Sequence, residues 1–593
     1  MRCLNKIDNP HNLKHLSLEE LNVLASEIRE ALLKKISICG GHFGPNFGMV
    51  ETTIALHYVF NSPIDKFVFD VSHQSYVHKI LTGRKDAFID PEKFSSVTGY
   101  TEPHESEHDM FTIGHTSTSI SMACGLAKSR DLLGKKENII AIIGDGSLTG
   151  GEAFEGLNYA KQLNSNLIII VNDNDQSISD TYGGLKYHLK ELRDSNGESN
   201  NNMFKALGFE YLYVAQGNDI EKLIAAFSKV KDVDHPVVVH IHTEKGKGYE
   251  MAERNKEDWH WFPPFFPETG EKRRKMSGEN YDDMVGDYLL EKMHNDPSVC
   301  AILAAVPATL GFNKERREKA GKQFIDVDIC EQHALSLAAG IAKNGGKPVV
   351  GTFSTFYQRA YDQIAQDICI NKMPVTILIR NGSIWAGNDV THTGWLDMSA
   401  FANIPNMVFL CPTNCEEYFA MLDWSIEQND FPVCIRIPRN GVHHVSTQVD
   451  NDYSNLNKNK VNIKGEKVAI FAVGDFYQMG EDLCSSVKNK LGFQPTLINP
   501  RYVSGIDEAL LDELQKDHIV VITLEDSILD GGYGQKIASY YGTSDMKVLN
   551  YGLRKEYLDG YNATCVLNEY GINIDKIINT IKNIQDANSS KIC

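Results

Sequence analysis

Two short polar motifs in this chain follow apolar runs that have the composition of buried strands. The run 139–143 precedes Gly144-Asp145-Gly146, and the run 167–171 precedes Asn172-Asp173-Asn174. We predict a parallel strand for each run and a helix over 152–162 between them. This alternation indicates an α/β fold with mostly parallel sheets flanked by helices. Asp145 and Asn174 then follow neighbouring strands.

Asp145 and Asn174 are therefore expected at the carboxyl edge of the sheet, where open α/β sheets bind ligands. One carboxylate and one amide oxygen can hold Mg²⁺ if a backbone carbonyl, water and a diphosphate complete its coordination. Gly146 would let the backbone approach the phosphates without a Cβ between them. The alternative is a tight turn at Gly-Asp-Gly and asparagines that only cap the backbone. The two flanking strands favour the magnesium–diphosphate interpretation.

Length and composition exclude several classes of protein. A chain of 593 residues is too long for one core and indicates several domains. The net charge of −19 argues against nucleic-acid binding. No apolar run approaches the roughly 20 residues needed to cross a bilayer, and the first residues lack the apolar core of a signal peptide. We expect a cytoplasmic protein whose twelve cysteines are reduced thiols.

The pattern of apolar and polar segments predicts three consecutive α/β domains. A helix is expected over 18–38, with Ser17 as its N-cap and Glu20 as the capping-box partner. Polar, loop-like runs at 255–275 and 446–465 are interpreted as linkers, and 193–203 as a loop. The expected domains are residues 1–275, 276–445 and 466–593.

The arrangement of Asp145 and Asn174 resembles the thiamine-diphosphate signature of the transketolase superfamily. Such a cofactor also needs a carboxyl group on its pyrimidine ring, and Glu331 is the best candidate. Glu331 lies between a predicted strand at 324–327 and a helix of small residues at 334–342, where burial would favour its neutral form. The alternative is a helix N-terminal glutamate that only complements the helix dipole.

Histidines are frequent in the first 120 residues, and imidazole suits proton transfer at a carbonyl carbon. His42, His73 and His115 follow glycine-rich or strand-end segments. His57 lies in a helix-like run and is interpreted as structural, whereas His78 is left open.

Over essentially its whole length the chain resembles the 1-deoxy-D-xylulose 5-phosphate synthase family of that superfamily. The matching segments are residues 51–60, 73–74, 78–84, 114–121, 177–179, 245–250, 331–333, 354–363, 391–392 and 438–439. The resemblance implies a transketolase-like fold, with a diphosphate-binding, a pyrimidine-binding and a C-terminal domain in that order. It also implies thiamine diphosphate and Mg²⁺ as cofactors and a homodimer as the assembly.

The same resemblance implies roles for individual residues. Cofactor contacts are expected at His73, Gly114, His115, Thr116, Gly146, Ser147, Asn174, Tyr249, Glu331 and Phe356. Mg²⁺ ligands are expected at Asp145, Asn174 and the backbone carbonyl of Gln176. Catalytic roles are expected for Glu331 and for His42, His260 and His392, which would face the substrate, and Arg359 and Arg439 would hold the acceptor.

The family joins pyruvate to glyceraldehyde 3-phosphate with loss of carbon dioxide, and its product feeds isoprenoid and thiamine synthesis. We expect this reaction here. One alternative is a related enzyme that transfers the pyruvate-derived two-carbon unit to another aldehyde or ketone. A second alternative is a non-catalytic chain that has kept the fold, which the intact Asp145, Asn174 and Glu331 disfavour.

Three substitutions relative to the family concern the acceptor. Asn381 replaces an arginine that helps to grip the acceptor phosphate, Phe353 replaces a tyrosine, and Asn388 replaces an aspartate. Arg380 is adjacent to the first of these, but strand alternation predicts that it points elsewhere. The segment between 179 and 204 is also much shorter than in the family.

Overall fold

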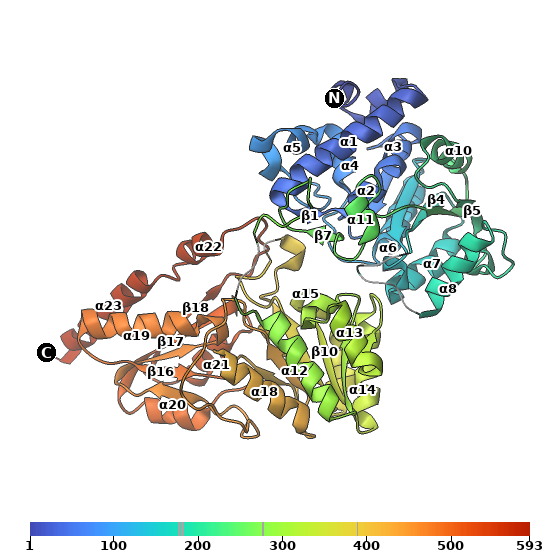
Figure 1. Ribbon diagram of the computed structural model, residues 1–593. Coiled ribbons are helices and arrows are strands. Elements are labelled where there is room, and N and C mark those ends of the chain that lie inside the picture. The colour runs from blue at the N-terminus through green and yellow to red at the C-terminus, as the bar shows by residue number, and fades with distance from the viewer. Residues whose placement is uncertain (176–177, 179–182, 275–277, 388, 593) are drawn as a thin grey trace. The chain divides into compact units, whose positions relative to one another are not determined.

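The computed structural model describes residues 1–175, 178, 183–274, 278–387 and 389–592 (Figure 1). The chain divides into two compact units. The first comprises Met1–Ser277 with Val327–Cys330, and the second comprises Gly278–Asp326 with Glu331–Cys593. The described residues form one large sheet in the first unit and two in the second. The three expected domain ranges stay a prediction.

The sheet of the first unit has five strands, all parallel, in the order β2-β3-β4-β6-β5. The strands are β2 (Lys66–Phe69), β3 (Ile139–Gly144), β4 (Leu167–Asp173), β5 (Glu210–Val214) and β6 (Pro236–His242). The strands predicted at 139–143 and 167–171 are therefore confirmed, and β3 and β4 are direct neighbours.

Helices cover both faces of this sheet because alternate strand residues point to opposite sides (Figure 1). Ile139, Ala141 and Ile143 pack with α6 (Ser119–Leu132), α7 (Gly151–Leu163) and α8 (Gly183–Asp194). Ile140 and Ile142 pack with α3 (Val50–Val59) and α10 (Ile220–Val230) on the other face.

The predicted N-terminal helix is confirmed as α1 (Leu18–Cys39). Ser17 and Glu20 form its capping box.

The interpretation of 255–275 as a linker is wrong for its described residues. Within this run β7 (Trp261–Phe262) pairs antiparallel with β1 (Gly41–His42). Trp259, Phe262 and Phe265 are buried in the same core as α1. The physical reason is that aromatic side chains bury a large apolar area, so a run rich in them packs even where prolines prevent regular structure.

The first sheet of the second unit has six parallel strands in the order β12-β13-β11-β10-β8-β9. They are β8 (Val299–Leu303), β9 (Phe324–Asp326), β10 (Lys347–Phe353), β11 (Thr376–Arg380), β12 (Val408–Leu410) and β13 (Val433–Arg436). The helices α12 (Tyr281–Asn295) and α18 (Cys415–Glu427) share one core with this sheet. The helix α14 (Glu331–Lys343) contacts β8 and β10 and begins three residues before the predicted start.

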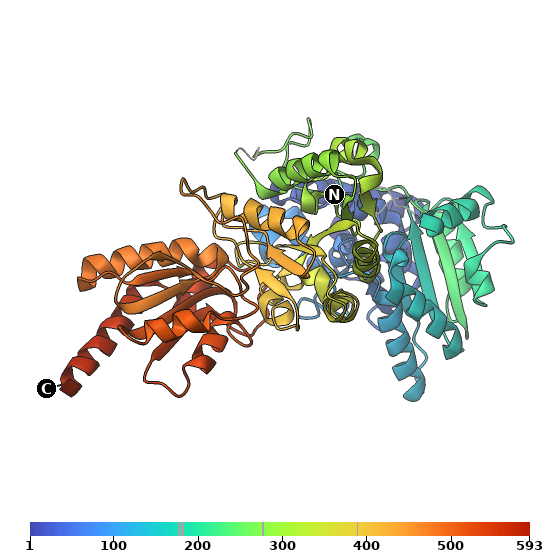
Figure 2. The same cartoon turned by 90° about the horizontal axis from the view of Figure 1, so that it is seen from below.

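The C-terminal sheet, drawn in orange to red in Figure 2, has the strand order β14-β16-β15-β17-β18. Its strands are β14 (Lys460–Ile463), β15 (Lys467–Ala472), β16 (Thr496–Asn499), β17 (His518–Ile528) and β18 (Lys547–Leu553). On one face it packs against α19 (Tyr477–Leu491) and α23 (Ile574–Ile592). On the other face, Tyr533 of α21 (Tyr533–Tyr540) contacts Phe471. Because β14 pairs antiparallel with β16, the interpretation of 446–465 as a linker is wrong at 460–463.

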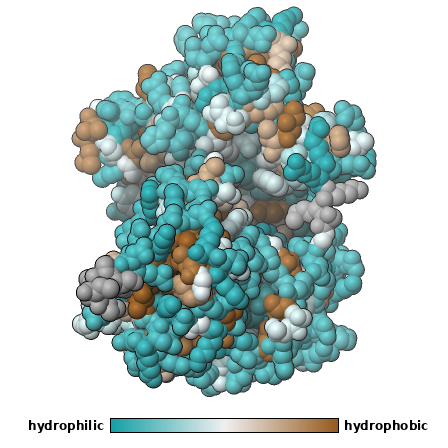
Figure 3. Space-filling view, turned by 90° about the vertical axis from the view of Figure 1, so that its left-hand side faces the viewer, coloured by the Kyte–Doolittle hydropathy of each residue, from teal (hydrophilic) through white to brown (hydrophobic). Residues whose placement is uncertain are grey.

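Hydrophilic side chains dominate the face shown in Figure 3, with apolar side chains in small separate patches. Among the described residues, none of the helices combines the length and the low polarity needed to cross a membrane.

A buried ion cluster connects the two sheets of the second unit. Arg436, the last residue of β13, binds Asp397 through Nε and Nη2, each at 2.9 Å, and also binds Asp526 of β17. A Cβ on Gly382 would overlap with Arg436 and Asp397. Only glycine therefore fits at this position, where the chain after β11 passes the cluster. The cluster thus positions the chain that follows β11 and β13.

Replacing Arg436 by methionine should lower the free energy of unfolding of the second unit by about 3–5 kcal/mol, because two buried carboxylates lose their cation. Urea unfolding followed by circular dichroism measures this change. The control is Arg316→Met, which removes exposed ion pairs to Asp283 and Asp287 and should cost less than about 1 kcal/mol. Equal shifts for both variants would contradict the assigned role of the cluster.

Candidate active site

The carboxyl edge of the first sheet is organised by Asp70, which follows β2. Its buried carboxylate accepts hydrogen bonds from the backbone N–H groups of Ser117 (2.8 Å) and Ser119 (3.0 Å). The hydroxyl of Ser117 donates to the carbonyl oxygen of Ser147 at 2.8 Å. These bonds tie the loop that carries Gly114, His115 and Thr116 to the loop that carries Gly146 and Ser147. Gly150 has no room for a Cβ, which would overlap with Ser117.

Asp145 and Asn174 follow the neighbouring strands β3 and β4, as predicted. Asp145 is buried, and the buried Oδ1 of Asn174 has no hydrogen-bond partner in the described structure. An unpaired buried acceptor is costly unless a ligand satisfies it, and a cation would do so. The described residues contain no group of three His, Cys, Asp or Glu side chains suited to a metal. A cation at this pair would therefore need non-protein ligands, which fits a diphosphate.

Gln176, the third expected Mg²⁺ ligand, lies outside the described residues, and so does Asn388. The assignment of the metal site stays a prediction.

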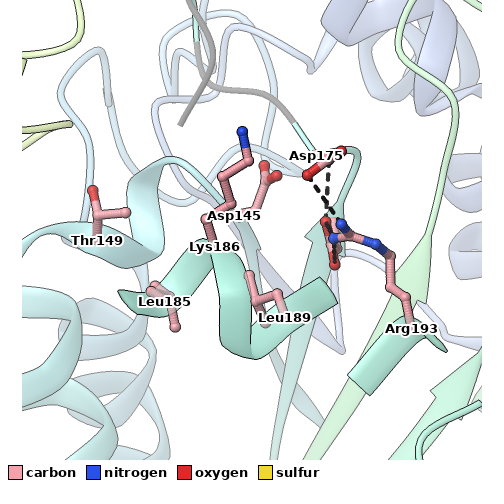
Figure 4. A pocket seen from close by; sticks show the side chains of 8 residues that line it. Asp145, Thr149, Asp175, Leu185, Lys186, Leu189 and Arg193 are labelled. Atoms are coloured by element: carbon pink, nitrogen blue, oxygen red, sulfur yellow. Dashed lines mark hydrogen bonds and ion pairs between the residues drawn. The ribbon is translucent and has the colours of Figure 1, made fainter. Parts of the chain in front are cut away.

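The helix α8 is held against the expected metal pair by Asp173, the middle residue of the Asn-Asp-Asn motif. The buried carboxylate of Asp173 pairs with Arg193 of α8 at 2.6 Å and with His240 at 2.9 Å. A cavity of about 10 Å³, room for one water-sized particle, lies between α8 and Asp145. Figure 4 shows Lys186 of α8 and Asp145 extending into the same space. Residues 183–194 of the shortened segment thus form a helix, and residues 195–202 are turns and loop.

Three histidines that are far apart in sequence come together in the first unit. The ring of His42 lies 5.0 Å from that of His73 and 5.7 Å from that of His260, and the His73 and His260 rings are stacked at 5.2 Å. Pairing of β1 with β7 brings His260 to His42. The side-chain amide of Asn46 donates to the carbonyl oxygens of both His42 (2.8 Å) and His73 (2.7 Å).

Burial keeps these imidazoles neutral. It lowers the pKa of His73 to about 3, with a smaller contribution from the charge of Lys245. It also holds the pKa values of His42 and His260 well below the usual value. The Nδ1 atoms of His73 and His260 are buried and find no partner among the described residues. The cluster therefore offers neutral donors and acceptors for a ligand rather than positive charge.

Three other expected site residues, His115, Thr116 and Tyr249, also lie in the first unit. His115 and Thr116 are half-buried in the loop fixed by Asp70. The hydroxyl of Tyr249 donates to the carbonyl oxygen of Pro267 at 2.9 Å, and its ring packs against Phe43 and Trp259.

His57 and His78 belong to a separate buried network. His57 Nε2 lies 2.9 Å from His78 Nδ1, and His78 Nε2 lies 2.9 Å from the carboxylate of Asp109, which also pairs with Arg84 at 2.7 Å. This network is consistent with the structural role expected for His57. We interpret His78, which lies in the same network, as structural too.

In the second unit Glu331 is the first residue of α14 and is buried. Burial raises the pKa of its carboxyl group, as expected, while Arg359 opposes this shift. Arg359 donates to Oε2 of Glu331 at 3.3 Å. The raised pKa makes the glutamate more ready to share or hold a proton than an exposed one.

Three aromatic rings near the expected acceptor group form a cluster. Phe356 lies 5.1 Å from Phe353 and 5.5 Å from His392. The guanidinium group of Arg380 lies 5.1 Å from the ring centre of Phe353.

The prediction that Arg380 points away from this group is wrong. Phe353 and Arg380 are register partners on the parallel strands β10 and β11, and register partners on neighbouring strands place their side chains on the same face. Arg380 also forms a bidentate ion pair with Asp282 of α12. Asp282 lies 3.6 Å from Arg439. Asn381 follows with φ of 60°, in the left-handed region.

Sequence reasoning missed Asn46, Asp70 and Lys245 in the first unit and Asp282 in the second. Asn46 and Asp70 bind backbone groups of the site loops, the charge of Lys245 acts on His73, and Asp282 pairs with Arg380. A signal existed only for Asp70, a strand-end acid like Asp145. Asn46, Lys245 and Asp282 act through contacts with chain segments that are remote in sequence.

The buried histidines predict acid sensitivity of the first unit. The pKa of His73 is lower when folded than when unfolded, so stability is present above about pH 6.5 and is lost as pH falls toward about 3. Between pH 7 and pH 5 one such histidine lowers the free energy of unfolding by about 2 kcal/mol.

His73→Asn should remove the part of the fall in the free energy of unfolding between pH 7 and pH 5 that protonation of His73 causes. Urea unfolding at both pH values measures this change. The exposed His104→Asn should leave the loss unchanged. An unchanged pH dependence in His73→Asn would contradict the prediction.

Comparison with known proteins identifies the family. A family model described as 1-deoxy-D-xylulose-5-phosphate synthase matches residues 4–201 and 195–243. The models for the pyrimidine binding and C-terminal domains of transketolase match residues 278–443 and 457–577. Among solved structures, a transketolase from Campylobacter jejuni covers 96% of this chain and 100% of its own at 18% identity and a TM-score of 0.44.

Curated relatives match over nearly their whole length. The 1-deoxy-D-xylulose-5-phosphate synthase of Natranaerobius thermophilus is 38% identical, covering 98% of this chain and 98% of its own. That of Caldanaerobacter subterraneus is 37% identical, with 98% of each chain covered. The chain therefore belongs to the 1-deoxy-D-xylulose-5-phosphate synthase family.

Proposed function

We propose that this chain condenses pyruvate with D-glyceraldehyde 3-phosphate, with loss of carbon dioxide, to give 1-deoxy-D-xylulose 5-phosphate. The observation that carries the proposal is the match to synthases of that name over 98% of both chains. The intact Asp145, Asn174 and Glu331 support an active enzyme over a non-catalytic chain.

Thiamine diphosphate and Mg²⁺ are the cofactors of the proposed reaction, and the residues present fit them. The unpaired Oδ1 of Asn174 and the buried carboxylate of Asp145 would bind Mg²⁺, together with the carbonyl oxygen of Gln176. The diphosphate and the rings would be held by His73, Gly114, His115, Thr116, Gly146, Ser147, Tyr249 and Phe356. When bound, the thiazolium ring supplies the electron sink needed for decarboxylation.

Glu331 is assigned as the acid–base group at the cofactor's pyrimidine ring. Its raised pKa allows it to hold or share a proton at a ring nitrogen, whereas an exposed glutamate would be fully ionised. Arg359, which donates a hydrogen bond to Glu331, opposes the rise in the pKa of Glu331. Arg359 is also assigned to binding of the acceptor.

His42 and His260 are assigned to hydrogen bonds with the carbonyl and hydroxyl groups of the substrates. As neutral imidazoles they can donate to a carbonyl oxygen or accept from a hydroxyl without a charge to desolvate. His392, which lies against Phe356, is assigned the same task, and Arg439 is assigned to the acceptor.

We also propose a cytoplasmic homodimer. Exposed apolar side chains suit an interface, and the helices α6 and α7, which pack against each other, offer Leu132, the C-cap Leu133, Phe154 and Tyr159. The cysteines that the structure describes are all free thiols, which fits a reducing compartment. Light scattering coupled to size exclusion tests the assembly, and a monomeric mass would overturn it.

Product analysis tests the proposed reaction. The chain is supplied with thiamine diphosphate, Mg²⁺, pyruvate and an acceptor, and the products are identified by mass spectrometry. D-glyceraldehyde 3-phosphate should give 1-deoxy-D-xylulose 5-phosphate. A clear preference for an unphosphorylated aldehyde or for a ketone would instead support the alternative reaction.

Glu331→Gln should lower the rate of product formation by at least about 100-fold, because the amide cannot exchange a proton at the pyrimidine. Calorimetric titration with thiamine diphosphate and Mg²⁺ should still show binding, since Asp145 and Asn174 remain. The control is Glu417→Gln, which should retain activity. Glu417 is a buried residue of α18 that accepts a hydrogen bond from Asn499. Near-normal activity of Glu331→Gln would contradict the assignment.

A further inference from the structure

Two arginines of the second unit share one carboxylate. Arg380 forms a bidentate ion pair with Asp282, and Nη1 of Arg439 lies 3.6 Å from the same carboxylate. The backbone N–H of Arg439, rather than its guanidinium group, donates to Asp475. The charges of Asp282 and Asp475 both act on Arg439, but of these two carboxylates only that of Asp282 pairs with the guanidinium groups. The guanidinium group of Arg439 is therefore the less well paired of the two positive charges.

The second charge is poorly compensated. The Nε atom of Arg439 is buried and has no partner among the described residues. Burial, followed by repulsion from Arg380, lowers the pKa of Arg439. Like charges held together in a partly buried place are destabilising unless an anion binds between them. A phosphate group carries about two negative charges and accepts the paired N–H bonds that an arginine fork offers.

The two arginines also lie beside the residues assigned to the acceptor. Arg380 covers the ring of Phe353, and Phe353 contacts Phe356, which in turn contacts His392. The ring of Phe353 also lies 6.5 Å from that of His392, so an anion bound by the arginines would be separated from His392 by the width of about one ring. A small aldehyde with a phosphate at its far end spans such a distance.

We propose that Arg380 and Arg439 together bind the phosphate group of the acceptor substrate and that Asp282 is the internal counter-ion which this phosphate displaces. This proposal rests on the proposed function and identifies its acceptor as a phosphate monoester. Arg380 supplies the guanidinium group that Asn381 lacks, from one residue earlier in the chain. Phe353 positions Arg380 by stacking instead of donating a hydrogen bond.

Steady-state kinetics of the loaded enzyme with two acceptors tests this proposal. Arg380→Ala should raise KM for D-glyceraldehyde 3-phosphate by about 10-fold or more, because a charged, paired hydrogen bond is lost. It should change kcat/KM for unphosphorylated D-glyceraldehyde by less than about threefold, since that acceptor has no phosphate. Arg380→Lys should fall between, because it keeps the charge and loses the fork.

The reciprocal variant is Asp282→Asn. It preserves the shape of the side chain and removes the competing charge, so KM for D-glyceraldehyde 3-phosphate should fall and inhibition by inorganic phosphate should strengthen. The matched control is Arg316→Ala, which breaks ion pairs to Asp283 and Asp287 on the same helix α12 and should leave both acceptors unaffected.

Three outcomes would overturn the proposal. They are an equal loss with both acceptors in Arg380→Ala, an unchanged KM in that variant, and a raised KM in Asp282→Asn. Any of these leaves the proposed function standing if the unmodified chain still makes the phosphorylated product. If it uses neither acceptor, the proposed function fails. The anion site is then tested by whether inorganic phosphate raises the Tm of the unmodified chain more than that of Arg380→Ala.

Discussion

The two hydrogen bonds that Asp70 accepts from the backbone of Ser117 and Ser119 determine the arrangement of the first unit's site. They hold a loop without regular structure against the carboxyl ends of the strands. Through the hydroxyl of Ser117 the same constraint reaches Ser147 and the glycine-rich turn after β3. A carboxylate buried for this purpose must be satisfied by backbone donors, and Asp70 is. The rigid sheet thus positions groups that lie on its loops.

The two units differ in whether their buried polar side chains are neutral or charged. The first unit keeps its histidines neutral by burial, so they provide hydrogen bonds without requiring counter-ions. The second unit keeps charges and pairs them, as with Glu331 and Arg359 or Arg380 and Asp282. Neutral groups suit contacts with carbonyl and hydroxyl oxygens, whereas charged groups suit a phosphate or a proton-sharing carboxyl.

Sequence patterns predicted the strands around Asp145 and Asn174 because buried parallel strands are short apolar runs, and that signal is local. They also predicted that burial would raise the pKa of Glu331. They failed at 255–275, where aromatic residues pack around the two-residue strand β7, and at 460–463, where a polar edge strand lacks the apolar signal. The contacts of His260 with His42 and His73 depend on strand pairing across more than two hundred residues, which no local pattern contains.

In the proposed acceptor site, Arg380 supplies the charge that the resemblance to the family expects one residue later, at Asn381. Alternation along β11 predicts that neighbours face opposite sides, but Arg380 is the last residue of the strand and Asn381 leaves it in a left-handed conformation. The face of Arg380 is set by its register partner Phe353, not by its neighbour. Replacing tyrosine by phenylalanine removes a hydroxyl and leaves an apolar ring on which a guanidinium group can stack. In this proposal the two expected substitutions act together, because the ring of Phe353, which lacks a hydroxyl donor, carries an arginine that has several donors.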